Sequence, residues 1–287
     1  PLPCLCVLTL QAGFFIVGGG AVHGSRLIAV CLGLLLSLGW PGLAQAKTLS
    51  ATPVASGDRC LIAVQQERYG DAIAACTQAI DRAIGSQTEA ADYRLSRGVA
   101  FYRSGHFAEA IADNTEVLAT HPDDYRAYYN RGLVQIALHS FEAAIADFDQ
   151  AVVLASDPMS LADIYDDRGL AKLMAAQPQA ALRDFDQALA IDSNDTRALF
   201  NHGCACHQLG RFSDALADLN QVLALEPNHA RTYLKRGVLR QTLGDRAGSL
   251  ADLRQAADCA QTQGQPHLHH YILTLLNEWQ TPSTSLG

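Results

Sequence analysis

The chain has 287 residues and a formal net charge of −8, and it is long enough for one or two ordinary domains. The acidic balance disfavours contact with the phosphate backbone of a nucleic acid, so we expect neither DNA nor RNA as a partner. Hydrophobic residues make up 49% of the chain, but the segment 2–43 is almost free of charged side chains and inflates this figure.

The N-terminal segment has the organisation of an export signal. Arg26 precedes the apolar run LIAVCLGLLLSL at 27–38, and a Trp-Pro-Gly sequence at 40–42 interrupts the run ahead of Ala44-Gln45-Ala46. This pattern predicts a secretory signal over 1–46 that is cleaved after Ala46. The alternative is an uncleaved membrane anchor at 27–38, although the run is shorter than the roughly 20 residues that a spanning helix needs.

Two short segments lie at the start of this signal and directly after it. The chain opens on Pro1 and has no methionine before Met159, and Val22 is a candidate alternative start codon. A start at Val22 would make 1–21 foreign to the native protein. Residues 47–52 are mostly small or hydroxyl-bearing, and we expect them to form a mobile leader.

A pattern of 34 residues then recurs, and it is most regular at 196–229. Counting Thr196 as position 1, this stretch has Gly203 at position 8, Gly210 at position 15, Ala215 at position 20 and Pro227 at position 32. Small residues at positions 8 and 20 let two antiparallel helices approach closely, and a glycine at position 15 permits a tight turn. Since the proline cannot extend the second helix, the stretch predicts one helix-turn-helix unit.

The same register defines six consecutive units. Five of them, at 91–124, 125–161, 162–195, 196–229 and 230–263, carry glycine at position 8: Gly98, Gly132, Gly169, Gly203 and Gly237. A degenerate unit at 53–90 comes first and has Cys60 at the glycine position. Three inserted residues precede Ala162. There we expect Pro158 to end one helix, Ser160 to cap the next, and the insertion to lengthen the loop between them.

The C-terminal segment 264–280 is predicted to be one amphipathic helix. Its apolar residues follow the spacing of one helical face: Leu268, Tyr271, Ile272, Leu275, Leu276 and Trp279. A stack of repeats needs a capping helix with a polar outer side where the stacking stops. We expect residues 281–287 to form a disordered tail.

The spacing of the glycine, alanine, aromatic and proline positions over 53–263 resembles the tetratricopeptide repeat (TPR) family. The resemblance implies an all-α superhelical solenoid, in which the first helix of every unit lines a concave face that binds a peptide or a partner helix. The style of the repeats is similar to that of bacterial TPR proteins, photosynthetic ones in particular. This similarity implies the periplasm or the thylakoid lumen as the compartment.

The resemblance also implies which positions face a partner, namely 2, 5, 6, 9, 12 and 13. On this face we expect the binding residues to be Arg126, Tyr129, Asn130, Asp163, Asp166, Asp167, Arg197, Phe200, Asn201, His207, Arg231 and Lys235. Asn130 and Asn201 match the asparagine that members of the family often use to hydrogen-bond a peptide backbone. Tyr129 and Phe200 are candidate aromatic anchors. The alternative is that the arginines only neutralise the aspartates of adjacent units and leave a solvated surface without a ligand.

Charged residues recur at two further positions of the units. Position 7 is Arg97, Arg131, Arg168 and Arg236, with His202 in the remaining unit, and position 23 is Asp113, Asp147, Asp184, Asp218 and Asp252. Positions 7 and 23 lie at nearly the same height in an antiparallel hairpin, so we expect arginine–aspartate pairs with a structural role, either within a unit or between neighbouring units.

The segment HGCACH at 202–207 invites a metal interpretation. On a helix, His202 shares a face with Cys206, and Cys204 shares a face with His207. Each pair supplies only half of a closed tetrahedral site, so we predict ordinary helix residues, no metal and no cofactor.

Cys60 and Cys76 fall at positions 8 and 24 of the degenerate unit, on facing helices. They are candidates for a disulfide that would join these two helices covalently at the end of the array. The predicted mature chain has five cysteines, so at least one thiol stays free.

The predicted mature chain has no glycine-rich loop after a strand, no Gly-x-Ser-x-Gly pattern and no His-Glu-x-x-His pattern, so we predict no enzyme. We expect a noncatalytic scaffold or adaptor for another protein. Two alternatives stay open. One is a structural protein that associates with itself into a homo-oligomer, and the other is an accessory subunit of a membrane or envelope complex.

Overall fold

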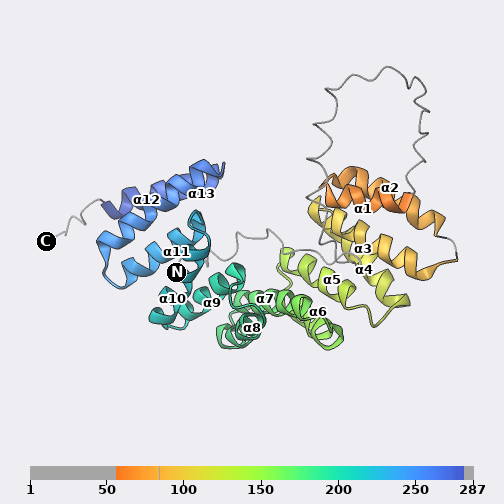
Figure 1. Ribbon diagram of the computed structural model, residues 1–287, viewed down its shortest axis with the longest axis horizontal. Helices are drawn as coiled ribbons and strands as arrows, with labels where there is room; N and C mark the ends of the chain where they lie inside the picture. The colour runs from red at the N-terminus through yellow and green to blue at the C-terminus, as the bar shows by residue number, and fades with distance from the viewer. Residues whose placement is uncertain (1–55, 84, 281–287) are drawn as a thin grey trace, which may run out of the picture. The chain divides into compact units, whose positions relative to one another are not determined.

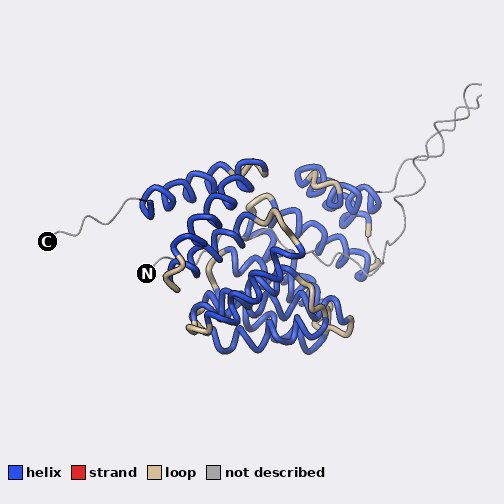
Figure 2. The backbone as a smooth tube through the Cα atoms, turned by 60° about the vertical axis from the view of Figure 1, so that its left-hand side comes forward, coloured by secondary structure: helices blue, strands red, loops and turns tan. Residues whose placement is uncertain are grey.

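The computed structural model describes residues 56–83 and 85–280. Within these ranges the chain forms thirteen α-helices and no β-strand (Figure 1). Figure 2 shows the same helices joined by short loops. The prediction of an all-α solenoid of helix-turn-helix repeats is confirmed. The predicted export signal at 1–46, the leader at 47–52 and the tail at 281–287 lie outside the described residues.

The helices come in pairs, one pair to a unit, and a last helix follows the final pair. Their bounds are α1 (Ser56–Gln65), α2 (Tyr69–Arg82), α3 (Gln87–Arg103), α4 (Phe107–Thr120), α5 (Tyr125–Ala137), α6 (Phe141–Leu154), α7 (Pro158–Met174), α8 (Pro178–Ile191), α9 (Thr196–Gln208), α10 (Phe212–Leu225), α11 (Ala230–Thr242), α12 (Arg246–Thr262) and α13 (Pro266–Gln280).

The described chain divides into two compact parts, 56–122 and 123–280, each of which contains several repeat units. In the first, α1 packs on α2, α2 on α3, and α3 on α4. In the second, each helix from α5 to α12 packs on the next one. The first helices α5, α7, α9 and α11 also pack on one another in this order, so they form one continuous layer of 123–280.

The turn between the two helices of a unit requires a residue with positive φ. Gly105, Gly210 and Gly244 fill this place at position 15 with φ of 78°, 73° and 83°. His139 and Ala176 occupy the same place in their units with φ of 58° each. A side chain in this conformation costs roughly 1 kcal/mol, so the packing of the two helices imposes the turn even without glycine.

In the units of Gly132 and Gly169, the glycine at position 8 lies against the phenylalanine ring at position 24. A Cβ atom on Gly169 would lie 2.6 Å from a ring carbon of Phe185, a distance that leaves no room for a side chain. In the degenerate unit these positions are Cys60 and Cys76, which are joined by a disulfide with their Cα atoms 4.6 Å apart. The disulfide therefore uses the same close approach that requires glycine elsewhere.

The three-residue insertion before Ala162 is accommodated differently from the sequence-based expectation. Pro158 does not end a helix but is the first residue of α7, and Asp157, not Ser160, is the N-cap, accepting a hydrogen bond from the Ser160 N–H at 2.9 Å. Proline suits this first position because its missing N–H is not needed there. The insertion lengthens α7 to 17 residues, against 13 in α5, and does not lengthen the loop.

The last helix, α13, covers the end of the stack. Ile272, Leu275 and Leu276 are buried in a cluster with residues of α12 such as Leu253 and Ala256. His270, Thr274, Asn277 and Glu278 on its other side are exposed. Among the described residues, none of the helices is long and apolar enough to cross a membrane.

Candidate functional site

Each arginine at position 7 holds the aspartate at position 23 of its own unit. Arg131 donates from Nε and Nη2 to the two carboxylate oxygens of Asp147 at 2.8 and 2.7 Å. The same two-bond contact joins the pairs Arg97–Asp113, Arg168–Asp184 and Arg236–Asp252. The aspartates are nearly buried, so these pairs fix the two helices of a unit in register.

Three of these arginines, Arg97, Arg168 and Arg236, also reach the preceding unit. Arg168 donates from Nη1 to Asp149 at 2.7 Å, and Arg236 donates from Nη1 to Asn220 at 2.7 Å. In the part 56–122, Arg97 donates to the Thr77 hydroxyl at 2.9 Å. The position-7 residue is therefore a structural link between neighbouring units.

His202 replaces this arginine in the fourth regular unit. Its Nδ1 atom lies 2.7 Å from Asp218, and its Nε2 atom lies 3.4 Å from Asp186 of the preceding unit. Burial lowers the pKa of His202, but hydrogen bonds to Asp218 and Cys206 outweigh it and raise the pKa to about 10. At neutral pH the imidazolium therefore takes the place of the guanidinium.

On the first helices, three aspartates of α7 converge on one arginine of α9. Arg197 lies 3.2 Å from Asp163, 2.8 Å from Asp166 and 3.2 Å from Asp167. We call these four residues the acidic cluster. Burial raises the pKa of Asp163 to about 6 and that of Asp166 to about 7. Three carboxylates thus share one guanidinium, and two of them hold their protons more tightly than an exposed aspartate does.

The acidic cluster ties three first helices together. Tyr129 of α5 donates from its hydroxyl to Asp167 at 2.7 Å, and Asn201 of α9 donates from its amide to Asp166 at 2.9 Å. Arg197 neutralises aspartates of the adjacent unit, as the solvated-surface alternative expected. Tyr129, Asp166 and Asn201 are almost completely buried, however, so this part of the face is not a solvated surface.

Asn130 differs from Asn201, although both stand at position 6. The residue is only 1% exposed, and neither its amide nitrogen nor its amide oxygen has a hydrogen-bond partner among the described residues. A buried polar group without a partner costs roughly 1 to 3 kcal/mol. Asn130 therefore keeps an unused donor and an unused acceptor on α5.

The other residues predicted for this face have individual surroundings. Arg126 pairs with Asp124, the N-cap of its own helix, at 2.9 and 2.7 Å. His207 packs against the ring of Phe212, and burial lowers the pKa of His207 to about 4. Phe200 is 5% exposed and lies edge-on to the ring of His229. Lys235 is 7% exposed and Arg231 is partly buried.

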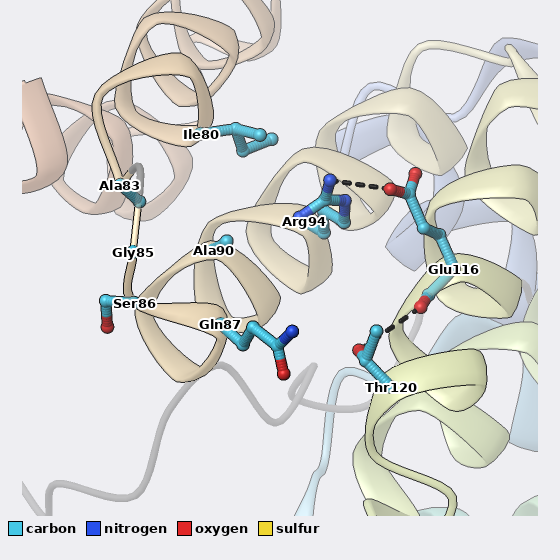
Figure 3. Close-up of a pocket in the computed structure, with 9 residues that line it drawn as sticks. All are labelled: Ile80, Ala83, Gly85, Ser86, Gln87, Ala90, Arg94, Glu116 and Thr120. Carbon is cyan, nitrogen blue, oxygen red and sulfur yellow. Dashed lines mark hydrogen bonds and ion pairs between the residues drawn. The ribbon is translucent and has the colours of Figure 1, made fainter.

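A pocket of about 290 Å³ lies in the part 56–122, between the end of α2, the start of α3 and the side of α4 (Figure 3). The side chain of Arg94 points to Glu116, and the two are 2.6 Å apart. Because this cation is already paired, the pocket does not have the character of an anion site.

The match to protein families agrees with the fold. A model described as tetratricopeptide repeat matches residues 59–116 and 95–158, and a second, described as TPR repeat, matches 203–244. No curated protein matches the sequence.

Solved structures share the fold at low sequence identity. PilF of Pseudomonas aeruginosa aligns with a TM-score of 0.63 and 16% identity over 77% of this chain and 96% of its own. A tetratricopeptide repeat protein of Parabacteroides merdae aligns with a TM-score of 0.59 and 16% identity over 79% and 93%. YrrB, described as a TPR protein with an unusual peptide-binding site, has a TM-score of 0.53 and 23% identity over 68% and 98%. The chain belongs to the tetratricopeptide repeat proteins, whose fold points to protein–protein interaction.

Proposed function

We propose that this protein is a noncatalytic adaptor that binds a peptide or a helix of a partner protein along the first-helix face. This face consists of positions 2, 5, 6, 9, 12 and 13 of α5, α7, α9 and α11. The continuous packing of these four helices supports the proposal, because a bound segment would then cross several units. The likeness to YrrB, whose description names a peptide-binding site, agrees with it.

The side-chain amide of Asn130, unpaired within the described part of the chain, is the main support for this proposal. The amide has a nitrogen that donates and an oxygen that accepts, the two kinds of group that a peptide backbone needs. Both are buried and without a partner among the described residues, so bonding to a peptide would recover a cost that the free protein bears. A partner has to displace the atoms that cover Asn130, since only 1% of the residue is exposed.

The acidic cluster indicates the chemistry of the partner. Asp163, Asp166 and Asp167 share the single guanidinium of Arg197, which leaves an excess of carboxylates. A lysine or arginine of the partner would complete the charge balance. The raised pKa values of Asp163 and Asp166, about 6 and about 7, mean that the negative charge grows as the pH rises through this range. We therefore propose a segment that contains a basic residue and binds more tightly at pH 8 than at pH 6.

Selection from a library of random peptides with the purified chain tests this proposal. We expect enriched peptides to carry lysine or arginine, and we expect Asn130→Ala to weaken their binding about tenfold, the loss of roughly one hydrogen bond. Asn194→Ala is the matched control, because Asn194 is exposed in the loop before α9. Equal affinity for wild type and Asn130→Ala would remove Asn130 from the site.

Crosslinking tests the location of the face independently. A photoreactive group at Met174, at position 13 of α7, should capture the selected peptides. The same group at Val153, which is 78% exposed on the second helix α6, should not. Capture from Val153 alone would place binding on the opposite side of the repeats.

We also propose that the protein works in an oxidising compartment after export, either the periplasm or the thylakoid lumen. The disulfide between Cys60 and Cys76 supports this location, because disulfides persist in oxidising compartments and are rare in the cytosol. Alkylation of free thiols in intact cells should leave Cys60 and Cys76 unmodified. A mature N-terminus at Lys47 would support cleavage after Ala46, whereas alkylation of both cysteines would contradict export.

A further inference from the structure

The aspartate at position 23 has two cationic partners in two of the units of 123–280. Asp184 accepts from Arg168 at position 7 and from Lys172 at position 11, the latter at 2.7 Å. Asp252 has the same environment, with Arg236 at position 7 and Arg240 at position 11, the latter at 2.9 Å. Each of these buried carboxylates is thus surrounded by two positive charges.

The unit 196–229 has side chains that can bind a metal at both of these positions. Position 7 is His202 and position 11 is Cys206, while Asp218 is kept at position 23. The His202 Nδ1 atom lies 2.7 Å from the Asp218 carboxylate and 3.7 Å from the Cys206 sulfur. One donor atom from each residue lies within 4.8 Å of the other two. Sequence spacing had paired His202 with Cys206 as half of a site, and Asp218 of the facing helix α10 adds a third donor.

The distances fit a tetrahedral metal ion. Zinc–nitrogen and zinc–sulfur bonds of about 2.0 and 2.3 Å place the two ligand atoms about 3.6 Å apart, close to the 3.7 Å observed here. The Nδ1–carboxylate distance of 2.7 Å has to open by about 0.6 Å, because the metal takes the place of the shared proton. Asp218 and His202 are partly exposed, with 16% and 12% of their side chains accessible, so an ion can enter from solvent.

The surroundings of His202 also suit a metal ligand. A histidine that binds a metal through one ring nitrogen usually donates its other N–H to a carboxylate or a carbonyl. Here the Nε2 atom of His202 lies 3.4 Å from Asp186 of α8, on the side of the ring away from Cys206 and Asp218. Asp186 would orient the ring and hold the Nε2 proton in place.

We propose that this protein binds one divalent transition-metal ion of the zinc type through His202 Nδ1, Cys206 Sγ and Asp218 Oδ2, with solvent as the fourth ligand. The two positive charges of the ion replace the two cations that neighbouring units place at positions 7 and 11. The ion joins α9 to α10 as the Arg–Asp pairs join the helices of other units.

Cobalt(II) titration of the purified full chain tests this proposal, with the Cys60–Cys76 disulfide intact and without added thiol. We expect one ion per chain, an absorption band from thiolate-to-cobalt charge transfer, and loss of the band when zinc is added. The ligand variants are Cys206→Ser and His202→Arg. His202→Arg restores the residue of the four other regular units at position 7, so it should fold, but it should bind the ion at least about 100-fold more weakly. Asp186→Asn should weaken binding about tenfold.

Cys259→Ser is the matched control, because Cys259 is also a buried free cysteine but lies on α12. It should bind cobalt as tightly as wild type. Absence of the charge-transfer band in wild type would overturn the proposal. Unchanged affinity in His202→Arg, or loss of the band in Cys259→Ser alone, would also overturn it, because either result places the ion elsewhere.

Discussion

Replacing Arg131 by methionine is expected to lower the free energy of unfolding by roughly 3 to 5 kcal/mol. Both oxygens of Asp147 accept hydrogen bonds from Arg131, and only 8% of the Asp147 side chain is exposed. Methionine keeps much of the volume of the arginine stem but removes the charge. It therefore leaves a buried carboxylate without its partner, which costs more than the pair itself contributes. Urea denaturation at pH 7 measures the change.

Arg168→Met is the matched comparison, because the Asp184 carboxylate keeps Lys172 at 2.7 Å after the substitution. We expect a smaller loss, about 1.5 to 3 kcal/mol, for this variant, which is the value of a hydrogen bond to a charged group, because the aspartate keeps a partner. Position 11 in the unit of Arg131 is the neutral Gln135, which cannot take the same role. Equal losses in the two variants would show that a second cation does not protect the aspartate.

Reduction of the disulfide between Cys60 and Cys76 is expected to lower the free energy of unfolding of the part 56–122 by about 3 kcal/mol. The two cysteines are 16 residues apart, and closing a loop of this length in the unfolded chain accounts for a stabilisation of that size. The bond joins α1 to α2. Thermal unfolding with and without a phosphine reductant measures the effect, and loss of protection of the α1 and α2 amides in hydrogen exchange locates it.

The double variant Cys60→Ser, Cys76→Ser should behave like the reduced wild type and should not respond to the reductant. Cys259→Ser provides the control for thiol effects outside the disulfide, and it should respond as wild type does. A reductant that leaves the wild-type midpoint unchanged would mean that packing alone holds α1 on α2. A midpoint shift in the double variant would trace the effect to another group.

The repeat register in the sequence determined the fold and the Arg–Asp pairs. Helical periodicity fixes which residues of one helix share a face, and the small residues at positions 8 and 20 fix where two helices approach. Positions 7 and 23 then lie at the same height, and the structure shows that they pair within a unit, as Arg131 and Asp147 do. The same argument placed Cys60 opposite Cys76.

The sequence did not decide which side chains of different units meet, because that depends on how far each helix is rotated and how closely neighbouring units pack. It left open whether the arginines of the first helices neutralise aspartates of adjacent units, and only the packed layer of first helices brings Asp163 to Arg197. The unequal environments of two equivalent asparagines are another example. Asn201 bonds to Asp166, whereas Asn130 has no partner among the described residues.

The insertion before α7 and the HGCACH segment show the same limit. The sequence could not distinguish a longer loop from a longer helix, because a proline can either end a helix or begin one. Pro158 begins α7. It identified His202 and Cys206 as neighbours on one helix, but Asp186 belongs to the preceding unit. By itself, the sequence determined what each repeat looks like, because spacing within a helical hairpin is set by local geometry. Only the tertiary structure decided which side chains of successive repeats meet, because that depends on the combined packing of all the helices.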